Sequence, residues 1–149
     1  MTGEAHDDDA YELFYSTFDW FVGHLEAVAA EPAVASEMHG HYNVAYELWY
    51  FVGRERLVLS DPLHLFSDDV RASLVSAVQA VSAVPREARV WTTIVEESLT
   101  NLQHPAWIPA RHVARDAMRL LAPAIAQMKA FVDAPRSKCD EEGRPPGEG

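Results

Sequence analysis

The sequence predicts an all-α fold, a single-domain bundle of about five helices. Apolar residues recur at the helical period in five segments, and Pro residues lie between most of these segments. Strand-like stretches are short and too few to make a sheet. At 149 residues the chain has the length of one domain and can bury a core without disulfides or metal. Helices of this length with short connections fit an orthogonal bundle or an up-and-down bundle equally well.

The folded domain is expected to span residues 10–133, with a disordered tail on each side. Residues 1–9 are polar and acidic, and residues 134–149 are rich in Pro, Gly and charge. Neither tail has enough apolar surface to offset the entropy of ordering it. The second tail holds Cys139, the only cysteine of the chain, so an internal disulfide is impossible and a reducing, cytoplasmic compartment is expected.

The first helix is expected to begin near Ala10, because Asp9 and Glu12 make a capping-box-like start, and to end before Pro32. Residues 11–51 hold eleven of the fifteen aromatic side chains, so this part should form the centre of the bundle. The apolar stripe of the first helix contains Phe14, Phe18, Phe21, Leu25 and Val28, and its polar stripe is acidic, with Glu12, Asp19 and Glu26.

The second helix is expected from about Ser36 to Gly53. Aromatic residues continue its apolar surface round the flank, so little of it can face water. Glu47 shares a narrow polar strip with Asn43 and Arg54. A structural ion pair with Arg54, with one of the arginines of the fifth helix or with His112 is favoured over a role as general acid or base. The residues expected to point inward are Val44, Leu48, Phe51 and Val52.

Residues 55–66 are expected to form a linker in which 57–59 makes a short extended piece. Ser67 then caps the third helix, because Asp68 and Asp69 in the first turn have the favourable sign at that end of the helix dipole. The inward residues of this helix are Val70, Leu74, Val78 and Val81.

The fourth segment, about Arg86 to Gln103, is ambiguous between helix and strand. Residues 89–95 are rich in strand-favouring side chains. A helix is favoured because apolar residues repeat at its period and strand alternation would break the pattern. The shared apolar face consists of Ala88, Trp91, Val95, Leu99 and Leu102.

The fifth helix follows a connection in which Trp107 lies between Pro105 and Pro109. Pro123 should kink this helix, since it leaves the carbonyl of Arg119 without a donor. The expected apolar stripe contains Val113, Ala117, Leu120, Ala124, Met128 and Phe131.

The net charge of -11, of which -6 belongs to residues 10–133, makes a basic protein the expected partner. An acidic body repels phosphate backbones and anionic headgroups, so no nucleic acid and no membrane surface is expected to bind. No segment approaches the roughly 18 apolar residues that a membrane span needs. Arg111, Arg115 and Arg119 form a positive rail, which is expected to lie against the acidic stripe or in water.

Motifs for catalysis or for cofactors are not found in the sequence. His39 and His41 lie near Glu37, but two ligands do not make a site, so no metal is expected. Neither a Gly-x-Ser-x-Gly turn nor a glycine-rich phosphate loop occurs, and no cofactor is expected. A binding function is therefore favoured, while the possibility of an enzyme stays open because catalytic residues can meet from distant positions.

The expected function is that of a small acidic noncatalytic protein-binding module, an inhibitor, immunity-type or antitoxin-type partner of a more basic protein. Size and composition alone suggest the comparison with such partners. Glu12, Asp19 and Glu26 would steer the encounter, and Trp20 and Trp107 would anchor it. Trp107 fits equally well as a plug at the end of the bundle. Association with a second copy of the chain is compatible with this pattern.

The alternative is a small helical-bundle enzyme or ligand-binding protein with an interior polar pocket. Glu47, His41, Tyr46 and His112 are the residues expected to line such a pocket.

Overall fold

The structure, a computed structural model, describes residues 3–133, with side chains from Asp9 onward. All regular structure in this part of the chain is helical, which confirms the all-α prediction. The elements in order are α1 (Gly3–Ala29), α2 (Pro32–Met38), α3 (Val44–Gly53), α4 (Leu57–Ser60), α5 (Asp68–Ser82), the 3-10 turn η1 (Arg86–Ala88), α6 (Val95–Leu102) and α7 (Trp107–Asp133).

The backbone of α1 begins at Gly3, so this helix includes most of the segment that was assigned to the N-terminal tail. Residues 134–149, the assigned C-terminal tail, lie outside the described residues. Within the described part, no helix combines the length and the apolar character needed to cross a membrane.

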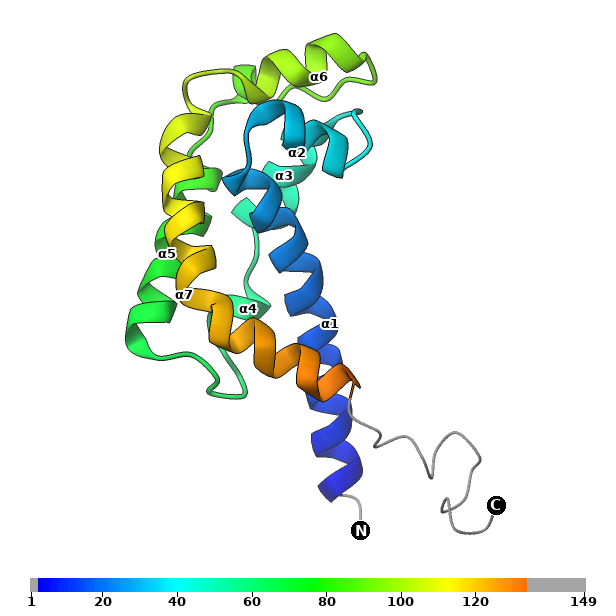
Figure 1. The fold of residues 1–149 in the computed structure, drawn as a ribbon, viewed down its shortest axis with the longest axis vertical. Coiled ribbons are helices and arrows are strands. Elements are labelled where there is room, and N and C mark those ends of the chain that lie inside the picture. Colours follow the sequence, from blue (N-terminus) through cyan, green and yellow to red (C-terminus); the bar gives the residue numbers. More distant parts are fainter. Residues whose placement is uncertain (1–2, 134–149) are drawn as a thin grey trace, which may run out of the picture.

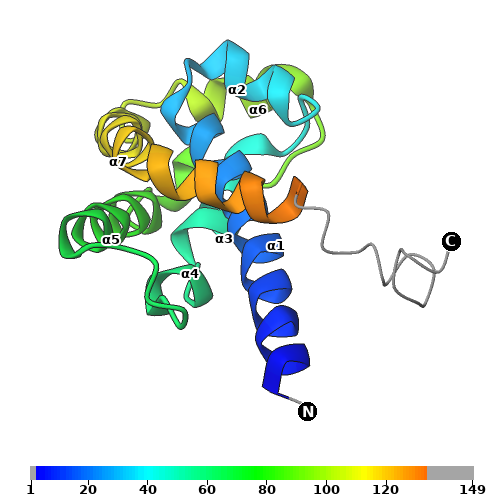
Figure 2. The same ribbon diagram turned by 60° about the horizontal axis from the view of Figure 1, so that its bottom comes forward.

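The two longest helices, α1 and α7, cross each other, and the remaining helices pack around them (Figure 1). Helix α1 contacts α2, α3, α4 and α7, while α5 packs against α7 and α3. Figure 2 shows α1 passing under α7, with α4 and α5 on one side and α2 and α6 at the far end. The bundle is therefore organised around α1, as its aromatic content predicts.

The core forms where the apolar stripe of α1 meets α3, α5 and α7. Phe18, Phe21 and Leu25 are at most 1% exposed, as their helical spacing predicts. In α5 the capping prediction is confirmed, because Ser67 Oγ accepts a hydrogen bond from the Val70 amide at 3.2 Å. The buried residues on the facing helices include Val44, Leu48, Val52, Leu74, Val81, Ala114, Ala117 and Leu121.

Pro123 lies inside α7, and the helix bends in its second half as predicted (Figure 1). The first half of α7 runs beside α5, and the second half crosses α1. The buried face differs from the predicted stripe, because Leu121 is fully buried whereas Leu120 is 37% exposed. A bent helix does not keep one straight stripe against its neighbours.

The single helix predicted from Ser36 to Gly53 is wrong, since the chain forms α2 and α3 with a loop between them. Gly40, His41 and Asn43 have left-handed backbone conformations, with φ of 84°, 73° and 55°. Three such residues within four positions end α2 and turn the chain. Glycine and asparagine tolerate this conformation well, which is the local reason for the break.

The helix preferred for residues 89–95 is also wrong, because residues 89–94 are neither helix nor strand and α6 begins only at Val95. This segment is held by side chains from elsewhere. Asn43 Oδ1 accepts a hydrogen bond from the Thr92 amide at 3.1 Å, and Asn101 Nδ2 donates to the Val90 carbonyl at 3.0 Å. Residues 57–59, expected to be extended, belong to α4.

A candidate binding groove along helix α1

A groove of about 670 Å³ runs along the exposed side of α1, and we call it the α1 groove. One wall comes from α7 and the other from α3 and His39, which follows α2. It is lined on α1 by Asp19, Trp20, Val22, Gly23, His24 and Glu26, on α7 by Met118, Ile125, Met128 and Lys129, and on the opposite side by His39, Glu47 and Phe51.

The floor of the α1 groove is a glycine between two carboxylates. Asp19, Gly23 and Glu26 are spaced by four and three residues, which places them on one helical face. Asp19 and Glu26 are exposed and lie two turns apart, about 10 Å along the axis. A Cβ atom added at Gly23 would meet nothing within 4 Å, so the space between the carboxylates is open.

Three aromatic rings form one side of the groove. The centroid of the Trp20 ring lies 5.0 Å from that of His24 and 5.6 Å from that of Phe51, and the Trp20 and Phe51 planes are nearly perpendicular at 84°. His24 is only 5% exposed, whereas the Trp20 side chain is 57% exposed. The indole is thus held by two neighbouring rings and still presents much of its surface to solvent.

The rings of His24 and His39 lie 4.6 Å apart at the groove. His24 Nδ1 is 2.9 Å from the Trp20 carbonyl, and His39 Nε2 is 3.4 Å from the Gly23 carbonyl, so each ring nitrogen can donate to α1. Burial lowers the pKa of His24, the hydrogen bond to Trp20 raises it, and the neighbouring His39 lowers it further. His24 is therefore neutral at physiological pH and contributes no positive charge.

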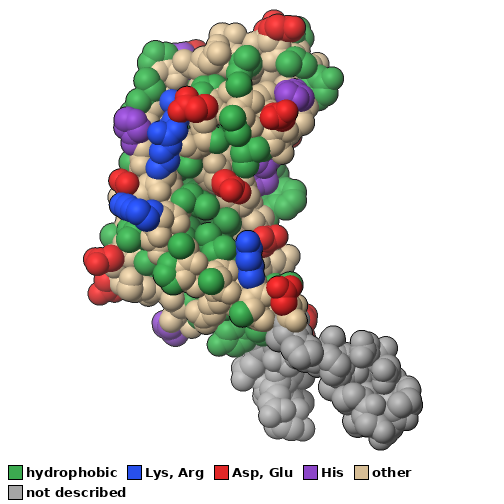
Figure 3. Space-filling model, in the orientation of Figure 1, with side chains coloured by type: hydrophobic (Ala, Val, Ile, Leu, Met, Phe, Trp, Pro, Cys, Tyr) green, Lys and Arg blue, Asp and Glu red, His purple; other side chains and the backbone are tan. Residues whose placement is uncertain are grey.

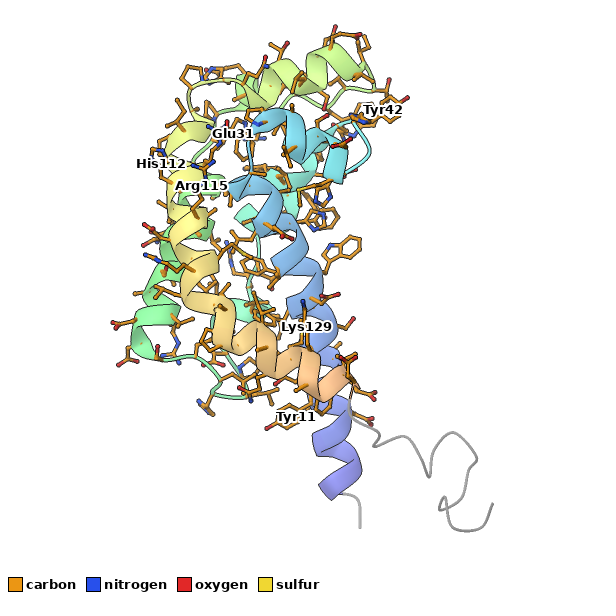
Figure 4. The ribbon with its side chains drawn as sticks, in the orientation of Figure 1. Tyr11, Glu31, Tyr42, His112, Arg115 and Lys129 are labelled. Carbon is orange, nitrogen blue, oxygen red and sulfur yellow. The ribbon has the colours of Figure 1, made fainter. Side chains whose placement is uncertain are left out.

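The charge of the groove is negative. Asp19, Glu26 and Glu47 line it together with a single cation, Lys129. Figure 4 shows Lys129 extending from α7 in front of α1. On the face formed by α1 and α7, an apolar area is bordered by acidic side chains and by a few basic ones (Figure 3). A surface of this kind favours a ligand that combines positive charge with an apolar portion.

The predicted acidic stripe spans the α1 groove and the depression next to it. A second depression, of about 250 Å³, is lined by Glu12, Tyr15, Ser16, Asp19 and residues of α7 from Met128 to Asp133. Asp19 and Lys129 line both, so the two depressions adjoin. The structure thus brings Glu12, Asp19 and Glu26 to one continuous surface, with Trp20 beside them.

Trp107 is not on this surface, and its assignment as a partner anchor is wrong. The side chain is 2% exposed, and its Nε1 donates a hydrogen bond of 2.8 Å to the Ala88 carbonyl. At the first residue of α7 it closes the end of the bundle, and its indole N–H has the partner that a buried tryptophan usually needs.

The four residues expected to line an interior pocket do not come together. His41 is exposed and its Nδ1 lies 3.2 Å from Ser36 Oγ, Tyr46 packs against Trp49, and His112 is exposed on α7 (Figure 4). Only Glu47 lines the α1 groove. Glu47 is half-buried and, within residues 3–133, makes no ion pair, so the expected pairing with Arg54, an arginine of α7 or His112 is wrong.

The positive rail on α7 does not lie against the acidic stripe. Arg115 binds the end of α1, donating from Nε to the Ala29 carbonyl at 2.7 Å and from Nη2 to Glu31 at 2.8 Å (Figure 4). This guanidinium lowers the pKa of Glu31. Arg119 pairs with Asp116 on its own helix at 3.3 Å. The carboxylates of the α1 groove are therefore not neutralised by these arginines.

Sequence reasoning missed Gly23, His24, His39 and Lys129 as groove residues. The position of Gly23 between Asp19 and Glu26 is a local signal that could have indicated an open floor. The contact between His24 and His39 depends on how α2 folds back on α1, and no local pattern indicates it.

Within the described residues, no three His, Cys, Asp or Glu side chains are grouped so as to hold a metal ion. The chain has no significant match among protein family models, curated proteins or solved structures.

Proposed function

We propose that the protein is a noncatalytic binding module that holds a segment of a more basic protein in the α1 groove. Small inhibitors, immunity proteins and antitoxins act in this way, by covering a basic partner. The observation that carries the proposal is the joint presence of two exposed carboxylates, an open glycine floor and an exposed indole in one groove along α1.

Charge supports this proposal, because three carboxylates and one ammonium group line the groove. Such an excess attracts a basic partner over a distance of about 8 Å at physiological ionic strength and raises the rate of encounter. The Arg115 and Arg119 side chains are engaged elsewhere, so they do not compete with the partner for Asp19 and Glu26.

Apolar surface supports it as well, since charge alone gives little affinity. Exposed Trp side chains often carry much of the binding energy of an interface. Trp20 is such a residue, and Met118, Ile125 and Met128 continue the apolar surface across the groove. Methionine adapts its shape to different partners at low cost, which suits a binding wall.

The size of the groove favours a short segment of the partner over a large flat interface. A groove of about 670 Å³ lies within the roughly 300 to 1,000 Å³ of sites that enclose a small ligand. A loop, a chain terminus or one face of a helix fits such a space.

The same proposal places the protein in a reducing cytoplasm, because one cysteine in 149 residues allows no internal disulfide.

The proposal is tested by affinity capture with charge reversal. The variant Asp19→Lys/Glu26→Lys should lose a captured protein of basic isoelectric point that the wild type retains. The matched control, Glu87→Lys/Glu96→Lys, reverses the same number of exposed charges outside the groove and should retain it. Circular dichroism shows whether each variant is folded. Equal capture by both folded variants would exclude the α1 groove as the binding face.

A further inference from the structure

We propose that the α1 groove recognises an arginine side chain, whose guanidinium stacks on Trp20 and pairs with the carboxylates of Asp19 and Glu26. The inference deepens the proposed function and rests on the same groove. It names the chemical group that a partner must supply, and it is testable without knowing that partner.

Two aromatic rings on α3 are covered by guanidinium groups of this chain. The guanidinium of Arg89 lies 3.8 Å from the centroid of the Trp49 ring, and that of Arg54 lies 4.6 Å from the centroid of the Tyr50 ring. Trp20 is more exposed than either, at 57%. No cation of the described residues lies over its ring. Its face is available to a cation from outside.

The carboxylates of Asp19 and Glu26 line the same groove as Trp20, one on each side of the open position of Gly23 along α1. Glu47 approaches from α3 on the other side of the groove. Within the described residues none of these three carboxylates takes part in an ion pair. A cation that enters above Gly23 therefore meets acceptors on both sides.

The indole of Trp20 is held in place by neighbouring rings. His24 and Phe51 contact the Trp20 ring with centroid distances of 5.0 and 5.6 Å, and His24 is itself buried. A ring that is fixed before binding loses little conformational entropy when a ligand stacks on it. This arrangement suits recognition better than an isolated surface tryptophan does.

The groove suits an arginine side chain better than a lysine side chain. A guanidinium is planar, stacks on an aromatic face and can pair with a carboxylate in its own plane, while an ammonium group is compact and more strongly hydrated. The apolar wall formed by the half-buried Met118 and Ile125 can cover the methylene stem. A groove with one stacking face and several carboxylates at its edges is matched by the guanidinium.

A variant of Lys129 distinguishes this proposal from a simple loss of structure, because it should change arginine binding in the opposite direction. Its ammonium lies in the same groove and is exposed, so it competes with an incoming cation for Asp19. Removing its charge should strengthen arginine binding, whereas removing the charges of Asp19 and Glu26 should weaken it. Damage to the fold cannot produce both changes.

The experiment is a titration of the isotope-labelled full chain with three short peptides, followed by the indole N–H resonance of Trp20 and the amide of Gly23. The peptides are N-acetyl-Gly-Arg-Gly amide, the same peptide with lysine, and the same peptide with citrulline, which has the shape of arginine without its charge. One stacked cation with exposed ion pairs binds with a dissociation constant on the order of millimolar. The resonance of Trp20 is assigned by its disappearance in Trp20→Phe.

The arginine peptide should shift both resonances, with an affinity about threefold higher than that of the lysine peptide, and the citrulline peptide should shift neither. Asp19→Asn/Glu26→Gln should weaken arginine binding at least about threefold and Lys129→Gln should strengthen it, while Glu87→Gln/Glu96→Gln should leave it unchanged. Equal shifts with the citrulline or lysine peptide would overturn the proposal, as would no shift with arginine. If arginine fails while charge reversal still abolishes capture of a basic protein, the proposed function stands and only the arginine assignment falls.

Discussion

Asp61 and Arg71 form an ion pair in which Oδ2 of the aspartate lies 2.9 Å from Nη2 of the arginine. The Asp61 side chain is 1% exposed, whereas that of Arg71 is 40% exposed. The same carboxylate accepts hydrogen bonds from the amides of Leu65 at 2.7 Å and Phe66 at 3.1 Å. One buried aspartate therefore fixes the connection between α4 and α5, a segment that was expected only to be part of a linker.

Replacing Asp61 by alanine should destabilise the protein strongly. The change leaves two amides and a guanidinium without their acceptor, and breaking a partly buried pair of this kind costs about 3 to 5 kcal/mol. Asp61→Asn keeps the shape and tolerates the left-handed backbone at this position, where φ is 46°, so it should cost less, about 1 to 3 kcal/mol. Urea denaturation measures both. A loss below about 1 kcal/mol for the alanine variant would show that the pair is not structural.

The two tryptophans that the sequence offered as anchors should separate in their effects. Trp107→Phe removes the hydrogen bond to the buried Ala88 carbonyl and should lower the free energy of unfolding by about 1 to 3 kcal/mol. Trp20→Ala removes a largely exposed ring and should cost less than about 1 kcal/mol, while it reduces capture of the basic partner. Thermal unfolding and affinity capture on the same two variants check this. The reverse pattern would contradict the assignment of Trp20 to binding and Trp107 to the core.

Two glycines in helices should respond to alanine in opposite directions. A Cβ at Gly53 would lie 3.1 Å from the backbone of Ser82, where α3 meets α5, so Gly53→Ala should cost about 1 to 3 kcal/mol. A Cβ at Gly23 meets nothing within 4 Å, so Gly23→Ala should gain about 0.5 to 1 kcal/mol from helix propensity. Chemical denaturation compares the two variants. If Gly23→Ala is destabilising, the floor of the α1 groove is not open.

The helical period predicted the part of the fold that depends on local pattern. The stripe from Phe14 to Val28 is buried as its spacing requires, because one face of α1 meets the rest of the bundle. The loops at 39–43 and 89–94 could not be predicted in this way. They support each other through Asn43 and Thr92, residues 49 positions apart in sequence, and such a contact leaves no periodic signal.

The candidate site could likewise be predicted only where it depends on local sequence pattern. Asp19 and Glu26 lie seven residues apart on α1, so their common face follows from spacing alone, whereas only the structure shows that the exposed Trp20 lines the same groove. The walls of the groove come from α3 and α7. Their position depends on how these helices cross α1, and the sequence pattern does not predict that arrangement. Trp107 was misassigned because an aromatic residue between prolines has the same local pattern whether it points outward or closes the bundle.

Protonation of His24 should couple the stability of the protein to pH. Burial lowers its pKa below the ordinary value of 6.5, against the opposing effect of its hydrogen bond to the Trp20 carbonyl, and His39 lowers it further. The acidic residues Asp19, Glu26 and Glu47 line the same groove and favour the charged form, but burial is the largest effect. Because the unfolded chain binds the proton more tightly than the folded one, the contribution to stability is complete above pH 6.5 and is lost as the pH falls through the lowered pKa.

His24→Gln removes this titration and should flatten the fall in stability of the wild type below about pH 6.5. His112→Gln is the matched control, since His112 is exposed on α7 and its removal should leave the slope unchanged. Urea denaturation at intervals between about pH 5 and pH 8 measures the slope for all three proteins. Burial beside Trp20 and Phe51 disfavours the charged form of His24, so a wild-type slope equal to that of His24→Gln would mean that this ring is charged or solvated in the folded protein.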